Sequence, residues 1–160
     1  MKFTDYILID AINPELKATD KEGVIREMVQ SLLDADGIEQ EDYEAIVKSL
    51  LKQAELGGIY LGRDVALPNV YHPSMKRHIM AVAVSTEGIE CNKNDDEKVH
   101  FFFMVIYPPP FSGDTLRIAE HLTRRFKDGT LRERLLCAKT REEILALLEE
   151  DDNKEAMKKR

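Results

Sequence analysis

Two long apolar runs in the middle of the chain constrain the fold more than any other feature. "HIMAVAVST" extends from His78 to Thr86 and "VHFFFMVIY" from Val99 to Tyr107, each almost without a polar interruption. A strand with one solvated face alternates polar and apolar residues, whereas a strand covered on both faces is apolar throughout. The two runs therefore predict central strands with helices on both sides of their sheet. Gly88 and "NKNDDEK" predict turns between the runs, and the prolines from Pro108 onward close the second.

The N-terminal third predicts two helices that pack antiparallel beside this sheet. A capping box from Thr19 to Glu22 begins the first, and Gly37 ends it. "EQEDYEAIVKSLLKQAEL" predicts the second, and the glycines that follow end it. Apolar residues recur at helical spacing in both segments: Val24, Ile25, Met28, Val29, Leu32 and Leu33 in the first, and Tyr43, Ile46, Val47, Leu50, Leu51 and Ala54 in the second. We also expect a short strand from Tyr6 to Asp10.

The C-terminal third predicts three more helices, in "SGDTLRIAEHLTRRFKD", "TLRERLLCA" and "TREEILALLEE", the last with a capping box from Thr140 to Glu143. This order predicts an α/β fold, a single domain with a mixed β-sheet sandwiched by helices. We place the domain at residues 1–153 and a charged tail at 154–160. The acidic and then basic run "EEDDNKEAMKKR" is interpreted as solvated charge at a fraying helix end or in a disordered tail.

Composition narrows the class of protein. A chain of 160 residues with 43% hydrophobic and 33% charged residues fits one globular domain. No apolar run reaches the ~20 residues of a spanning helix, and no cleavage pattern follows the first residues, so neither membrane insertion nor a signal peptide is expected. Cys91 and Cys137 lack metal or paired spacing and predict reduced thiols in a cytoplasmic protein. The net charge of −7 disfavours nucleic-acid binding and is compatible with docking onto basic partner surfaces.

The chain lacks the common motifs of catalysis. No phosphate loop, zinc signature or nucleophile elbow is present, so no cofactor or metal is expected. Of the four histidines, His78 and His100 are interpreted as partly buried structural residues, and His121 as solvated or facing a partner. His72 is the strongest functional candidate, because it precedes a proline in a turn near the ends of strands.

Four segments carry a family resemblance: "LGGIYLGRDVALPN", "AVAVSTEGIE", "KVHFFFMVIYPPPFSGDTLRIAEHLTRRFKD" and "AKTREEILALLEE". With them the chain resembles the enzyme IIA domain of the bacterial phosphoenolpyruvate-dependent sugar phosphotransferase system, of the fructose/mannitol/nitrogen-regulatory type. The similarity extends roughly from Lys21 to Asn153, and "YLG…VALP" and "SGDTLRIAEHL" are its specific parts. The resemblance implies a histidine that accepts a phosphoryl group from a small carrier protein. That histidine passes the group to a IIB component or serves as a regulatory signal.

The chain departs from this family at the residues that handle charge. By the resemblance, the phospho-accepting histidine falls on Asn69, a second histidine on Thr115, an arginine on Gln53 and a glycine on Asp64. Phosphoryl transfer needs an imidazole nitrogen and donors for a group of roughly −2 charge. An amide nitrogen is a poor acceptor, and Asp64 is expected to add negative charge where the group arrives. The resemblance gives a candidate binding set of Tyr60, Gly62, Arg63, Asp64 and Arg117.

Three interpretations follow from these departures. We favour a non-phosphorylatable regulator that binds the carrier protein or a regulated partner protein. The alternative is a phosphocarrier that uses His72, which requires the turn "NVYHP" to fold back across a shift of up to ~10 Å. In a third, the turn is only structural, and a basic cluster of Arg117, Arg124, Arg125 and Lys127 binds a partner. The residues leave open the partner, the sugar or nitrogen branch, and whether the protein forms a homodimer.

Overall fold

The structure is a computed structural model that describes residues 2–57, 59–62, 64–91, 97–110 and 113–158. In the described chain, β1 is followed by the helices α1 and α2, then by the strands β2 to β6, and finally by the helices α3, α4 and α5. In chain order the elements are η1 (Phe3–Tyr6), β1 (Ile7–Asn13), α1 (Lys21–Asp34), η2 (Gln40–Asp42), α2 (Tyr43–Glu55), β2 (Tyr60–Gly62), β3 (Val65–Ala66), β4 (Asn69–Tyr71), β5 (Ile79–Glu90), β6 (Lys98–Tyr107), α3 (Asp114–Arg125), α4 (Gly129–Cys137) and α5 (Arg141–Lys158).

The strands form one mixed sheet in the order β1-β5-β6-β3-β2, and β4 also pairs with β6. The two predicted apolar runs are its central antiparallel pair, β5 and β6. β1 lies parallel to β5, and β3 and β4 lie parallel to β6. The mixed sheet that the sequence predicts is therefore confirmed, and the early strand is confirmed with later bounds.

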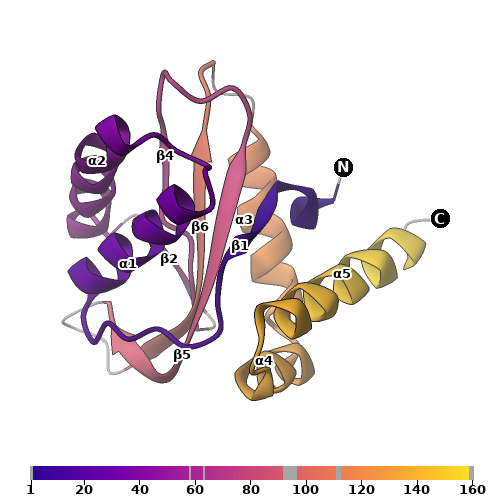
Figure 1. Ribbon diagram of the computed structural model, residues 1–160. Helices are drawn as coiled ribbons and strands as arrows, with labels where there is room; N and C mark the ends of the chain where they lie inside the picture. The colour runs from indigo at the N-terminus through magenta and orange to yellow at the C-terminus, as the bar shows by residue number, and fades with distance from the viewer. Residues whose placement is uncertain (1, 58, 63, 92–96, 111–112, 159–160) are drawn as a thin grey trace.

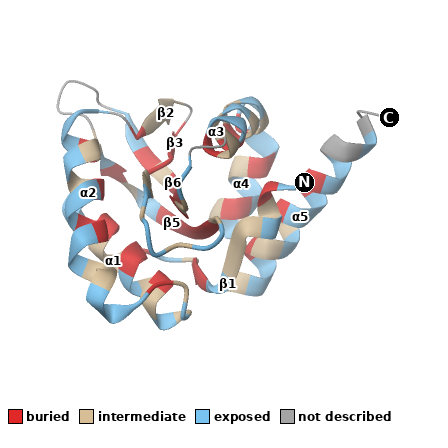
Figure 2. Cartoon of the chain, turned by 90° about the horizontal axis from the view of Figure 1, so that it is seen from above, coloured by how far each residue is buried: buried red, intermediate tan, exposed pale blue. Residues whose placement is uncertain are grey.

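The central strands bury both of their faces, because successive side chains point to opposite sides of a sheet. On one face Ala81 and Phe102 belong to a core that they share with α1 and α2. On the other face Val82 and Phe103 belong to a core that they share with α3, α4 and α5. The two groups of helices lie on opposite sides of the sheet (Figure 1). In the view from above, buried residues gather on the strands and on the helix faces turned toward them (Figure 2).

The helix caps agree with the sequence in one case and differ in the other. Thr140 Oγ1 accepts the Glu143 backbone N–H at 3.1 Å, as the second capping box predicts. At α1 the cap is Asp20, whose Oδ1 accepts the Gly23 N–H at 2.8 Å, so the predicted cap at Thr19 is wrong by one residue. Aspartate and threonine both satisfy orphan N–H groups at a helix start, so sequence alone does not separate adjacent candidates.

The acidic run in the C-terminal region is not uniformly solvated. α5 continues to Lys158 and so crosses Asn153, the predicted end of the domain. Asp151 and Asp152 are buried, and the prediction of solvated charge is wrong for both. Their burial follows from contacts with α3 and with η1, segments far away in the sequence that no local charge pattern reveals.

The two cysteines lie in different environments, which gives a simple prediction. Cys137 is exposed, whereas burial raises the pKa of the Cys91 thiol to about 11, an effect that the nearby Lys21 ammonium only partly opposes. Only about one Cys91 thiol in a thousand is then a thiolate at pH 8, and the thiolate is the reactive form. We expect iodoacetamide at pH 8 to modify Cys137 at least tenfold faster than Cys91, as measured by peptide mass spectrometry. Equal rates would contradict this burial of Cys91.

Candidate functional site

The turn around Asn69 is part of a strand path that runs along β6. β3 and β4 pair with β6 in one register, with Val65 opposite Phe101 and Asn69 opposite Val105. Between them the Pro68 carbonyl accepts the Val105 N–H at 2.9 Å. The residues from Asp64 to His72 therefore follow one nearly continuous parallel path beside the central strand.

Strand alternation determines which face of the sheet Asn69 occupies. Its neighbour Val70 packs into the core on the side of α1 and α2. Asn69 alternates with Val70 and pairs with Val105, which belongs to the core under α3. Asn69 therefore lies on the α3 face of the sheet.

The structure brings Gln53 and Asn69 together. Gln53 Oε1, on α2, accepts the Asn69 backbone N–H at 2.9 Å. The last hydrogen bond between this strand path and the β2 side joins the Leu67 N–H to the Ile59 carbonyl at 2.7 Å. Pro68 has no N–H, so the next donor along this edge is the Asn69 N–H, which needs another acceptor. The Asn69 side chain turns back on its own strand, since Nδ2 donates to the Leu67 carbonyl at 2.8 Å. The side-chain amides of Gln53 and Asn69 therefore both form hydrogen bonds with backbone groups at the edge of the sheet.

Thr115 lies in the first turn of α3, the helix that covers the Asn69 face. It is 8% exposed, and within the described chain its Oγ1 has no hydrogen-bond partner. The helix starts after Gly113, which offers no capping side chain. The predicted second-histidine position therefore carries a buried hydroxyl rather than a titratable group.

His72 lies on the opposite side of the sheet from Asn69. Its backbone N–H continues the ladder by donating to the Tyr107 carbonyl at 2.9 Å, so the chain does not fold back as the alternative interpretation requires. Its Nδ1 lies 2.7 Å from Ser74 Oγ, and Nε2 lies 3.8 Å from an Asp42 carboxylate oxygen at the start of α2. Ser74 Oγ also donates to Asp42 at 2.8 Å. His72, Ser74 and Asp42 together hold the loop after β4 against α2.

Asp64 is a structural residue rather than a charge at the predicted phosphoryl site. It precedes Asn69 by five residues along the same strand path, a separation of about 16 Å. Its buried carboxylate lies 2.5 Å from His100 Nδ1 and accepts from Arg132 Nη2 at 2.9 Å. The carboxylate therefore lies away from Asn69 along the strand path and is paired with the Arg132 guanidinium and the His100 imidazole, which does not support a role for Asp64 in repelling a phosphoryl group at Asn69.

The predicted binding residues fall into two separate places. Tyr60 and Gly62 lie in β2, near Asp64, and the Tyr60 hydroxyl donates to Glu97 at 2.6 Å. Arg63 lies outside the described residues. Arg117 is exposed on α3 and pairs with Asp114. Tyr60 and Gly62 therefore lie on β2 and Arg117 on α3, a helix that contacts β2.

An aromatic row beside the Asn69 face was not anticipated from the sequence. Tyr6, His78, Tyr107 and Tyr71 come from four adjacent segments, with successive ring centroids 5.3, 5.8 and 6.5 Å apart. His78 also lies 3.9 Å from the Asp114 carboxylate at the start of α3. Tyr71 lies two residues after Asn69 on β4 and therefore on the same face of the sheet. Strand alternation could have indicated this shared face from the sequence.

Burial affects the ionisation of two tyrosines in this row. It raises the pKa of Tyr6, where the Asp114 carboxylate adds to the effect and the Arg117 guanidinium opposes it. Burial also raises the pKa of Tyr107, with a smaller contribution from Tyr71. Both phenols are therefore neutral hydrogen-bonding groups across the physiological range.

The basic cluster predicted as a partner surface is divided by the structure. Arg125 is largely buried and forms a bidentate pair with Asp151, in which Nε donates to both carboxylate oxygens at 2.9 Å and Nη2 donates to Oδ1 at 2.5 Å. His121 is 15% exposed and faces Asp151 and Asp152, so its prediction as a solvated residue is wrong. Arg117, Arg124 and Lys127 remain exposed.

The described segments offer no metal centre and no membrane span. Within them, no three His, Cys, Asp or Glu side chains are grouped so that they could hold a metal ion. None of the helices in the same segments has the length and apolar character needed to cross a membrane.

Solved structures with a similar arrangement of strands and helices include proteins described as IIA proteins. The nitrogen regulatory protein IIA-Ntr of Neisseria meningitidis aligns with a TM-score of 0.77 and 22% identity, over 91% of this chain and 97% of its own. The mannitol IIA of Escherichia coli aligns with a TM-score of 0.70 and 22% identity, over 87% of this chain and 96% of its own. At these identities the likeness establishes the fold.

Sequence comparison establishes the family. The chain belongs to the family described as "Phosphoenolpyruvate-dependent sugar phosphotransferase system, EIIA 2", whose model matches residues 5–151. It is 26% identical to the PTS system fructose-specific EIIA component of Haloferax volcanii, over 89% of this chain and 91% of the relative. It is 23% identical to the nitrogen regulatory protein of Bradyrhizobium diazoefficiens, over 92% of this chain and 95% of the relative.

Proposed function

We propose that this chain is a regulatory, protein-binding EIIA protein of the cytoplasm that takes no phosphoryl group at residue 69. The observation that carries the proposal is the environment of Asn69, the position where the family resemblance places the phospho-accepting histidine. Asn69 faces α3, yet its amide is hydrogen-bonded to the Leu67 carbonyl and its backbone to Gln53. An amide nitrogen shares its lone pair with the carbonyl and therefore cannot act as the nucleophile.

The surroundings of Asn69 support the same function. The family resemblance places a second histidine at Thr115 and an arginine at Gln53, and neither residue here can carry a positive charge toward a phosphoryl group. Thr115 is buried in the first turn of α3, and Gln53 is committed to the edge of β4. Transition-state charge in phosphoryl transfer needs cationic or N–H donors in fixed positions. The surroundings of Asn69 therefore lack the charge-handling groups that the family resemblance places there.

We propose that the partner is the carrier protein of the phosphotransferase system or a protein that this system regulates. A structure of the Escherichia coli mannitol IIA in complex with phosphorylated IIB establishes protein docking for that relative. The α3 face here offers exposed Tyr71 and Leu116 for a contact of this kind. Aromatic side chains of this type are enriched among the residues that dominate protein interfaces.

The alternative function, phosphoryl transfer through His72, has less support. His72 lies on the far side of the sheet from α3, and Ser74 and Asp42 lie beside its two ring nitrogens. The Asp42 carboxylate, 3.8 Å from Nε2, disfavours an incoming phosphoryl group of like charge.

A phosphorylation assay tests both functions. The purified protein is incubated with phosphoenolpyruvate, the first enzyme of the system and its carrier protein, and a labile phosphoryl adduct is sought by intact mass. We expect no adduct on the natural protein or on the Asn69→Gln control, and an adduct on Asn69→His, because only the last supplies an imidazole at the family position.

One outcome of this assay and one binding measurement contradict the proposal in different ways. A stoichiometric adduct on the natural protein refutes the non-phosphorylatable function, and its loss in His72→Ala would identify His72 as the acceptor. The absence of an adduct on a folded Asn69→His variant would show that an imidazole at residue 69 is not sufficient beside Thr115 and Gln53. Failure of the purified carrier protein to bind the natural protein in isothermal titration would refute the docking of the carrier protein, and the regulated partner would then be the remaining candidate.

A further inference from the structure

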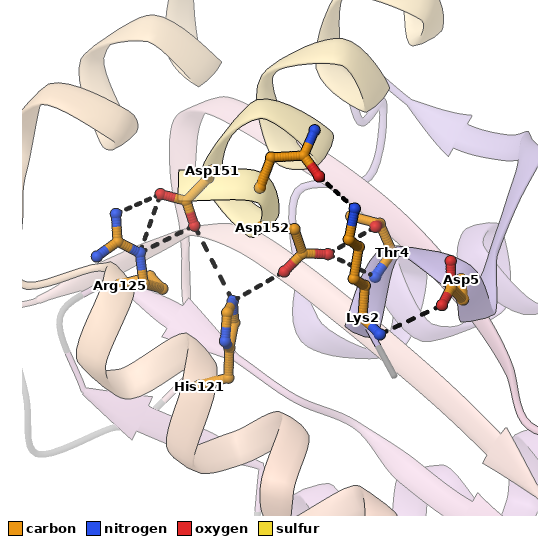
Figure 3. A network of polar contacts seen from close by, with 8 residues as sticks. Lys2, Thr4, Asp5, His121, Arg125, Asp151 and Asp152 are labelled. Atoms are coloured by element: carbon orange, nitrogen blue, oxygen red, sulfur yellow. Dashed lines mark hydrogen bonds and ion pairs between the residues drawn. The ribbon is translucent and has the colours of Figure 1, made fainter. Parts of the chain in front are cut away.

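A buried group of charged side chains joins α3 to α5. Arg125 Nε, on α3, donates to both carboxylate oxygens of Asp151 at 2.9 Å. His121 Nε2, one turn earlier on α3, lies 3.4 Å from Asp152 Oδ1 and 4.0 Å from Asp151 Oδ2. The two aspartate side chains are 8% and 3% exposed. Figure 3 shows the four side chains converging between the two helices.

The same group holds the N-terminal segment, residues 2–6, which we call the strap. Thr4 donates to Asp152 Oδ2 twice, from its backbone N–H at 3.1 Å and from Oγ1 at 2.6 Å. Lys2 Nζ donates to the side chain of Asn153, the residue after Asp152 in α5. One carboxylate, that of Asp152, therefore contacts the strap with one oxygen and the His121 imidazole with the other (Figure 3).

The strap also closes one side of a groove along α3. Phe3 is buried against His121, with ring centroids 4.7 Å apart, and against Phe103 at 6.2 Å. Phe3 and Tyr6 form one wall of a groove of about 550 Å³, and α3 forms the other. Tyr6 leads on to His78 and the aromatic row beside Asn69. Movement of the strap would therefore change the shape of the α3 face.

The balance of charge in the buried group depends on whether His121 is protonated. Charged groups reach this region from all three packed elements: Asp151 and Asp152 from α5, Glu120, Arg124 and Arg125 from α3, and Lys2 and Asp5 from the strap. Glu120 and Arg124 are exposed, as are Lys2 and Asp5, and solvent screens their effect. Within the buried group, Arg125 pairs with Asp151, and the His121 imidazole lies 3.4 Å from Asp152, where it supplies a positive charge only when it is protonated. A buried carboxylate without a nearby cation is unfavourable.

We propose that the strap is a pH-sensitive wall of the α3 groove, with His121 as its sensor. While His121 is protonated, its positive charge compensates the negative charge of the Asp152 carboxylate, which continues to accept hydrogen bonds from Thr4. When the pH rises and His121 loses that proton, two buried carboxylates share the single guanidinium of Arg125. Hydration then stabilises the Asp152 carboxylate more than its buried contacts do. The strap is the outermost of these contacts, so Thr4 separates from Asp152 first. The device does not depend on whether residue 69 accepts a phosphoryl group.

Amide hydrogen exchange of the strap in the full chain tests this device. The readout is the protection factor of the peptide that contains Thr4, corrected for intrinsic exchange, between pH 6 and pH 9. We expect protection to fall about tenfold or more across this range in the natural protein, since exchange reports local opening. The protection of the β6 peptide is expected to stay constant, which separates strap opening from global unfolding.

Three variants make the test specific. Asp152→Asn keeps an acceptor for Thr4 but removes the charge, so the strap is expected to stay protected without a pH dependence. His121→Gln is expected to remove the pH dependence as well. His72→Gln, which alters another partly buried histidine that faces an aspartate, is the matched control and is expected to retain it. A natural protein without a pH-dependent loss, or an unchanged loss in Asp152→Asn, would overturn the proposal.

Discussion

Replacement of Asp64 by alanine is expected to lower the free energy of unfolding by about 3 kcal/mol, because it breaks a buried ion network. The Asp64 carboxylate joins His100 on β6 to Arg132 on α4, and its backbone carbonyl accepts the Phe101 N–H at 3.2 Å. Arg132 is partly exposed, which places the expected loss at the lower end of the range for a broken buried pair. Urea unfolding followed by circular dichroism measures the change.

A matched control separates the ion network from backbone strain. Asp64 has a positive φ of 78°, a conformation that alanine adopts with difficulty. Asp36 has a φ of 59° but is exposed, so Asp36→Ala carries a similar backbone cost without loss of a buried network. We expect Asp64→Ala to be the more destabilising by about 2 kcal/mol. Equal losses in the two variants would mean that Asp64 contributes only its backbone conformation.

The second large effect is expected at Phe103, in the centre of β6. Phe103 is fully buried and packs against Phe126, the residue directly after α3, with ring centroids 5.7 Å apart, and against Phe3 of η1. Phe103→Ala is expected to cost about 3–5 kcal/mol of unfolding free energy, because the substitution leaves a cavity between the sheet and α3.

Leu116→Ala is the control for Phe103→Ala. Leu116 is an apolar residue of the same face but is 58% exposed, so its truncation is expected to change the free energy of unfolding by about 0.5 kcal/mol or less. The comparison is made by urea unfolding of both variants under the same conditions. A loss below about 1 kcal/mol for Phe103→Ala would contradict the central position of β6.

Local patterns were sufficient for the two central strands and the main helices, whereas the short strands β2, β3 and β4 had no predicted bounds. The apolar runs that form β5 and β6 lack polar interruptions because both of their faces are buried. Buried positions are occupied by apolar residues, so this burial is visible in the sequence. The helices were predictable because apolar residues repeat every three or four positions on the side that packs. Caps were less certain, as at Thr19 and Asp20, because several polar residues serve equally well at a helix start.

Local patterns misled where charged groups find partners at a distance. Asp151 and Asp152 form part of an acidic run that is usually solvated, yet α3 and the strap supply their counter-charges and donors. Asp64 was assigned to the phosphoryl site by the family resemblance, which places a glycine at its position. Strand geometry instead carries it about 16 Å away along β6, where it meets Arg132.

By itself, the sequence determined the α/β fold, its two layers of helices and the identity of residue 69, because these depend on residue type and short-range periodicity. Only the tertiary structure decided that Asn69 faces α3, that His72 faces α2 on the other side of the sheet, and that Gln53 reaches the edge of β4. These contacts join residues from separate elements, and they form only when the sheet and its helices pack. Their chemistry therefore depends on packing that no short stretch of sequence specifies.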